Sequence, residues 1–119
     1  MTMTEYTITL SWPNRALHSN SRAHWAVKSR ATKSYRGEAW AVGKVANLPF
    51  WPNAILEFTF HPPHLKYDVQ NIPSSLKAAI DGIADAMGCD DRKFRVRYPS
   101  EFAEKVKNGS IVVTVKEND

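Results

Sequence analysis

Hydrophobic and polar residues alternate along short segments of the chain, and this pattern predicts β-strands with one buried face. The clearest strand is 54–60, where Ala54, Leu56, Phe58 and Phe60 alternate with Ile55, Glu57 and Thr59. Two prolines follow this strand and end it, because proline cannot donate a hydrogen bond to a sheet ladder. Further strands are predicted at residues 6–10, 94–98 and 111–116, the last being rich in Val and Thr.

Apolar residues spaced three or four positions apart predict two helices. The first covers residues 25–46, and its core-facing stripe is Ala31, Tyr35, Ala39, Val42 and Ala46. The second covers residues 73–87, with Pro73 in its first turn, Gly88 as its C-terminal cap, and a stripe of Leu76, Ala79, Ile80, Ile83 and Met87.

The predicted order β-α-β-α-β-β indicates one α+β domain over residues 1–119, with two helices packed on a mixed or mostly antiparallel sheet. A chain of 119 residues suits one hydrophobic core. It contains no long apolar run and its N-terminus does not resemble a signal peptide, so we expect no membrane segment. A single cysteine, Cys89, favours a reducing, cytoplasmic location.

Charge divides the chain into three parts. Residues 1–67 carry a net charge of +5, residues 68–91 of −4, and residues 92–119 of +3. Basic surface suits a polyanion such as nucleic acid. Aspartates inside such a surface are typical of a metal-dependent nuclease, in which a cation neutralises them. The alternative is a helix with a solvated acidic face.

The candidate chemistry lies in the acidic segment. Asp68 precedes the second helix, and Asp90 and Asp91 follow it. A helix of about 15 residues is roughly 22 Å long. The carboxylates therefore meet only if the helix is shorter, if the approach to it runs back along its length, or if a partner chain completes the site. Carboxylates that do meet would bind Mg²⁺ or Mn²⁺.

Lys77 lies on the same helix face as Asp81, so its ammonium could stabilise a phosphate. The alternative is an ordinary helical ion pair worth about 0.3–0.5 kcal/mol. Asp90 and Asp91 could likewise be plain turn residues.

The string Asp68-x-x-Asn71, then Leu76-Lys77-Ala-Ala-Ile-Asp81-Gly, then Asp90-Asp91 before a strand resembles the RusA family. The N-terminal Tyr6-Thr-Ile-Thr-Leu-x-Trp-Pro is also similar, and the resemblance spans residues 6–115. RusA proteins are crossover-junction endodeoxyribonucleases (Holliday junction resolvases) of DNA recombination and repair, common on phages and prophages.

The resemblance implies a homodimer that binds four-way DNA junctions and cuts two strands symmetrically with Mg²⁺. It implies catalytic roles for Asp68, Asp91 and Lys77, and support from Asn71 and Asp81. The implied metal ligands are Asp68, Asp91, Asp90 and Gln70.

Two departures qualify this assignment. Gln70 stands where the family usually has a second aspartate, and its neutral amide oxygen would bind a metal more weakly. Another carboxylate would then compensate, the candidates being Glu57, Asp81 and Asp85. Alternatively, the protein is a catalytically silent junction binder. The spacing from Asn71 to Lys77 is also longer than in the short family version.

The residues predicted to bind DNA are Arg15, Arg22, Lys28, Arg30, Lys33, Arg36, Lys66, Lys93, Arg95 and Arg97. Those on the first helix could instead form a solvated face, and a generic nucleic-acid-binding module is a third possibility. His61 and His64 could bind metal or phosphate, but we favour a replacement of the basic run that precedes the first family aspartate. Core or dimer contacts are predicted for Trp12, Trp25, Trp40 and Trp51.

Overall fold

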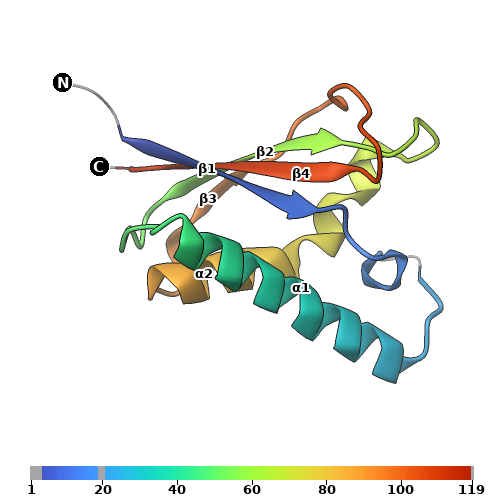
Figure 1. The fold of residues 1–119 in the computed structure, drawn as a ribbon, viewed down its shortest axis with the longest axis horizontal. Helices are drawn as coiled ribbons and strands as arrows, with labels where there is room; N and C mark the ends of the chain where they lie inside the picture. The colour runs from blue at the N-terminus through green and yellow to red at the C-terminus, as the bar shows by residue number, and fades with distance from the viewer. Residues whose placement is uncertain (1–3, 19–20, 119) are drawn as a thin grey trace.

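Four strands form one mixed sheet in the order β1-β4-β2-β3 (Figure 1). The computed structural model describes residues 4–18 and 21–118. The strands are β1 (Glu5–Ser11), β2 (Ile55–His61), β3 (Arg95–Arg97) and β4 (Ser110–Lys116). β4 runs antiparallel to both β1 and β2, whereas β3 is parallel to β2. The predicted α+β class with a mixed sheet is confirmed.

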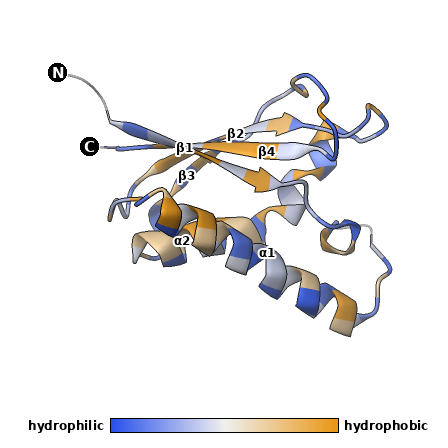
Figure 2. Cartoon of the chain, viewed as in Figure 1, coloured by the Kyte–Doolittle hydropathy of each residue, from blue (hydrophilic) through white to orange (hydrophobic). Residues whose placement is uncertain are grey.

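Two helices, α1 (Trp25–Val45) and α2 (Lys77–Met87), lie on the same side of the sheet (Figure 1). The strand register aligns Phe58 with Val113 and Ile8, and all three side chains are buried in the core. Glu57 is aligned with Thr114 on β4 and with Arg97 on β3, on the opposite, more exposed face. Figure 2 shows hydrophobic positions along β2, β4 and α2, and buried residues of these elements form the core. The alternation predicted for the second strand is therefore confirmed.

Small residues let α1 and α2 pack closely. A Cβ atom at Gly82 of α2 would lie 2.2 Å from the backbone oxygen of Arg36 and 2.8 Å from the Cβ of Ala39. On α1 the buried residues are Tyr35, Ala39 and Gly43, all in its C-terminal half. The part of α1 that packs against α2 therefore begins near Tyr35, and the helix has no buried residue before it.

The second helix is shorter than predicted. Residues 73–75 form a 3₁₀ turn, η3 (Pro73–Ser75), and the α-helix begins only at Lys77. The amide of Leu76 bonds to the carbonyl of Pro73, three residues back, and the backbone of Leu76 (ψ −2°) interrupts the α-helical geometry. The prediction of one helix over 73–87 is wrong in its first turn.

Other 3₁₀ turns that the sequence did not predict are η1 (Arg15–Leu17), η2 (Val69–Asn71) and η4 (Asp91–Lys93). Trp12 and Trp51 pack against the core. Trp25 and Trp40 are 75% and 46% exposed, so they lie outside the core, and a dimer contact stays a prediction for them. Both lie on α1, which has little of its surface covered. In the described part of the chain, no helix combines the length and apolarity needed to cross a membrane.

Candidate functional site

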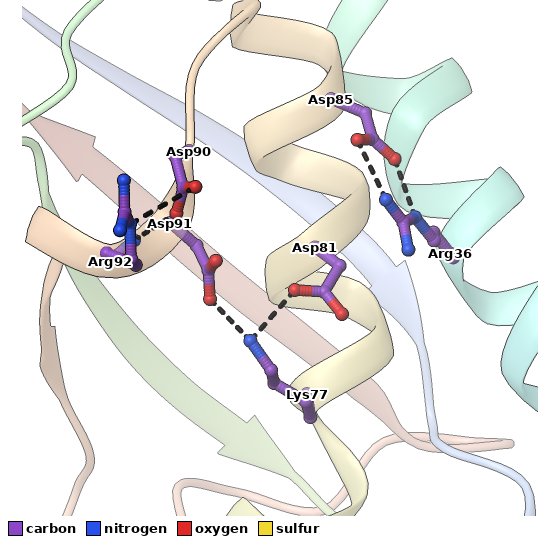
Figure 3. Close-up of polar contacts among 7 residues, drawn as sticks. All are labelled: Arg36, Lys77, Asp81, Asp85, Asp90, Asp91 and Arg92. Carbon is purple, nitrogen blue, oxygen red and sulfur yellow. Dashed lines mark hydrogen bonds and ion pairs between the residues drawn. The ribbon is translucent and has the colours of Figure 1, made fainter.

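Lys77 lies between two aspartates (Figure 3). Its Nζ atom is 2.9 Å from Oδ1 of Asp81, one turn further along α2, and 2.5 Å from Oδ2 of Asp91. Asp91 is separated from Lys77 by 14 positions in the sequence. The ion pair between Lys77 and Asp81 is thus the ordinary helical pair considered as an alternative. The contact with Asp91 makes it part of a larger cluster.

The turn after α2 brings Asp91 back to the start of the helix. Gly88 has a left-handed backbone (φ 75°), and its amide and that of Cys89 bond to carbonyls of the last helical turn. Asp90 then caps η4, because its Oδ1 accepts a 2.8 Å hydrogen bond from the amide of Arg92. Asp91 is the first residue of η4, and its side chain points toward Lys77 (Figure 3).

The electrostatics of the cluster follow from these contacts. Hydrogen bonds from the Lys77 ammonium lower the pKa of Asp91, and burial opposes this effect. The bonds to Asp91 and then Asp81 raise the pKa of Lys77. Both groups are therefore charged over a wide pH range. The side chain of Lys77 is 65% exposed, whereas those of the two aspartates are 26% exposed. The lysine is accordingly the member most accessible from solvent.

Asp68, Gln70 and Asn71 lie on or beside η2, which precedes η3 and α2 in the chain. Oδ1 of Asp68 accepts a 3.0 Å hydrogen bond from the amide of Gln70, and all three residues are exposed. Asp90 binds Arg92, with Oδ2 3.3 Å from Nε. The structure thus brings together Lys77, Asp81 and Asp91, and none of the described hydrogen bonds or ion pairs joins Asp68 to them.

Within residues 4–18 and 21–118, no three His, Cys, Asp or Glu side chains are grouped closely enough to hold a metal ion. The oxygens of Asp81 and Asp91 nevertheless converge on one point, now occupied by the Lys77 ammonium. Two carboxylates fit Mg²⁺, which commonly takes one or two carboxylates and retains several waters. The remaining carboxylates considered as substitutes are engaged elsewhere: Glu57 binds Lys116 and Arg97, and Asp85 binds Arg36.

A pocket of about 340 Å³ opens beside Lys77 and Asp81. Lys28 and Thr32 of α1 form part of its wall. The predicted DNA contact Lys28 therefore lies next to the cluster. Sequence reasoning missed other residues of this pocket, including His18, Thr32 and Ser74. No local pattern marks them, because they come from separate segments.

The other predicted DNA contacts are dispersed. Arg36 of α1 is bound by Asp85 at 2.7 and 3.0 Å, two helical turns further along α2 from Lys77 (Figure 3). Arg97 binds Glu57, and the strand register places Arg95 and Arg97 on the sheet face opposite the helices. The remaining exposed candidates are Arg15, Arg22, Arg30, Lys33, Lys66 and Lys93.

His61 and His64 have separate contacts. Nδ1 of His61 is 2.9 Å from the carbonyl oxygen of Glu104. The ring of His64 stacks on that of Tyr67, with centroids 4.7 Å apart. This arrangement gives no support to a metal site shared by the two histidines.

These features define an α+β protein with a lysine held between two aspartates at one end of a short helix. Over 114 residues the chain is 37% identical to an uncharacterized protein of Xylella fastidiosa (strain Temecula1 / ATCC 700964). The match covers 91% of this chain and 74% of the relative. The chain belongs to the same family as that protein. It matches no protein-family model.

Proposed function

We propose that this protein is a metal-dependent endonuclease of the RusA type that resolves four-way DNA junctions. The observation that carries the proposal is the meeting of Lys77 with Asp81 and Asp91. In the motif that resembles the RusA family, Lys77 thus lies within hydrogen-bonding distance of both Asp81 and Asp91. A basic chain with this carboxylate pair suits a phosphodiester substrate.

In this proposal Asp81 and Asp91 would hold Mg²⁺ or Mn²⁺, with waters in the remaining positions, and the resemblance adds Asp68, Asp90 and Gln70 to the ligand set. The ion would supply an activated water and neutralise charge at the phosphate. With Asp81 and Asp91 bound to an ion, the Lys77 ammonium would be available to donate to a phosphate oxygen as negative charge develops there. Its exposed side chain is suited to that movement. Lys28, across the adjoining pocket, positions the same DNA strand.

The proposed protein is a homodimer, because a four-way junction has two-fold symmetry and a two-fold dimer presents two identical sites to it. Analytical ultracentrifugation with and without a synthetic junction measures this state. A single protomer bound to each junction would contradict the symmetric mechanism.

Cleavage of a labelled synthetic four-way junction in Mg²⁺ or Mn²⁺ tests the proposal, with linear duplex and single strand as comparison substrates. We expect symmetric nicks in the junction alone. Asp91→Asn should reduce cleavage at least about a hundredfold. The matched control is Asp85→Asn, which removes a carboxylate two turns further along α2 that is bound to Arg36 rather than to Lys77, and it should leave cleavage within about twofold. Equal cleavage by wild type and Asp91→Asn would refute the assignment of this site.

A catalytically silent junction-binding protein is the second candidate. It is favoured by Gln70, which lacks the charge of the aspartate expected there. The same assay discriminates the two functions: selective junction binding without cleavage in either metal would favour the silent protein. Equal affinity for linear duplex and junction would instead indicate a generic nucleic-acid-binding module.

A further inference from the structure

A second pocket, of about 400 Å³, lies between the segment after β1 and the segment after β2. It is lined by Arg15, His18, His64, Lys66 and Tyr67. Two of these residues are permanent cations, and none is acidic. Neither Arg15 nor Lys66 forms an ion pair with a described residue. Their charges are therefore available to an anion.

Aromatic packing builds one wall of this pocket. Tyr67 stacks on His64, with an interplanar angle of 11°, and meets the edge of His18 with ring centroids 5.9 Å apart. Trp12 packs against Tyr67, with the two ring centroids 5.2 Å apart. The amide of Lys66 donates to Nδ1 of His64 at 3.2 Å, which leaves Nε2 to carry the proton of the neutral imidazole. Nε2–H is thus a hydrogen-bond donor.

His18, which lines this pocket, has a ring nitrogen without a partner among the described residues. This atom, Nε2, is buried. Buried polar atoms are nearly always paired, so such an atom indicates a missing partner. Burial, and then the charge of Arg15, lower the pKa of His18, so the imidazole is neutral near pH 7 and can donate from one nitrogen. His18 also lines the pocket beside Lys77 and Asp81, which makes the two pockets neighbours.

We propose that this second pocket binds a phosphate group of a nucleic-acid strand, next to the phosphate that is cut. Arg15 and Lys66 supply charge to the phosphate, Nε2–H of His64 donates to it, and His18 lines the pocket beside them. The proposal rests on the proposed function for the identity of the polymer and for the neighbouring reaction. The convergence of cations and a ring donor in the pocket does not depend on metal binding or cleavage.

The test uses the full-length Asp91→Asn protein, so that no strand is cut. The histidine ring signals are followed by NMR while inorganic phosphate or the hexanucleotide dT6 is added. We expect saturable shifts of His18 and His64 and tighter binding of dT6 than of phosphate. Arg15→Ala and Lys66→Ala, each added to Asp91→Asn, should weaken dT6 binding about tenfold. Lys105→Ala, which removes an exposed lysine outside the pocket, should change it less than twofold.

Each outcome bears on the proposal. Absence of saturable shifts, or equal weakening by the Lys105→Ala control, would overturn it. Phosphate that binds as tightly as dT6 would overturn the assignment to a strand and indicate a small-anion site. Thermal unfolding of each variant verifies that it is folded. If wild type fails to cleave junctions while dT6 binds in this pocket, the nuclease function fails and the pocket assignment stands.

Discussion

The close packing of α1 and α2 makes a sharp prediction about Gly82. In Gly82→Ala the new methyl group would meet the backbone oxygen of Arg36 at 2.2 Å and the Cβ of Ala39 at 2.8 Å. The backbone oxygen cannot rotate away as a flexible side chain would. The two helices must therefore separate by roughly 1 Å to reach ordinary contact distances.

The magnitude follows from two opposing effects. Overpacking in a close-packed core costs about 1–3 kcal/mol, and a contact with backbone belongs at the upper end. Alanine restores about 1 kcal/mol through its higher helix propensity. We expect a net loss of about 2 kcal/mol in the free energy of unfolding. This loss corresponds to a fall of about 8 °C in Tm and of about 1 M in the urea midpoint.

Gly37→Ala is the matched control, because it makes the same change within α1. A Cβ atom there would have nothing within 4 Å, and the residue is exposed. It should raise the free energy of unfolding by about 0.5–1 kcal/mol. Urea titrations followed by circular dichroism measure both variants. A Gly82→Ala protein as stable as wild type, or a Gly37→Ala protein that loses as much stability, would refute this account of the helix packing.

Asp68→Asn should abolish junction cleavage, because it removes a proposed metal ligand. Junction binding should persist or tighten, because the variant also removes a negative charge that repels phosphates. Cleavage that is retained at saturating Mn²⁺ would exclude Asp68 as a ligand. Gln70→Asp should lower the Mg²⁺ concentration that gives half-maximal cleavage, and a raised requirement in a Mg²⁺ titration would indicate that Asp81 already supplies the charge. A plot of the logarithm of the junction association constant against the logarithm of salt concentration should have a slope near −4 to −5, about one unit per phosphate contact. An affinity that does not change in a salt titration would exclude the basic surface as the DNA site. Lys77→Met should lower the free energy of unfolding by less than about 1 kcal/mol, because the lysine is largely exposed and its ion pairs are weakened by solvent. Its partner Asp91 has a lowered pKa, so wild type should be more stable than the variant above about pH 4, and this difference should disappear as pH falls through the pKa of Asp91. At alkaline pH the difference should disappear above about pH 10, as pH rises through the raised pKa of Lys77. A cost in urea titrations that persists at pH 2 would contradict the ion pair.

The sequence by itself determined the elements and much of the core. Alternation over 54–60 predicted which β2 side chains are buried, because strand periodicity reports directly on the two faces of a sheet. The sequence also predicted the apolar stripe of the second helix and its end at Gly88, since both depend on local spacing and backbone preference. The pair of Lys77 and Asp81 was predictable for the same reason.

Only the tertiary structure decided which distant segments meet. The contact of Lys77 with Asp91 depends on the path of the chain after Gly88, which does not follow from periodicity. Trp25 and Trp40 are exposed because the neighbours of α1, rather than its composition, determine which side chains are covered. The pocket of Arg15, His18 and Lys66 forms where the segments after β1 and β2 meet. Local sequence records the preferences of one segment, whereas such contacts depend on how the strands are ordered in the sheet.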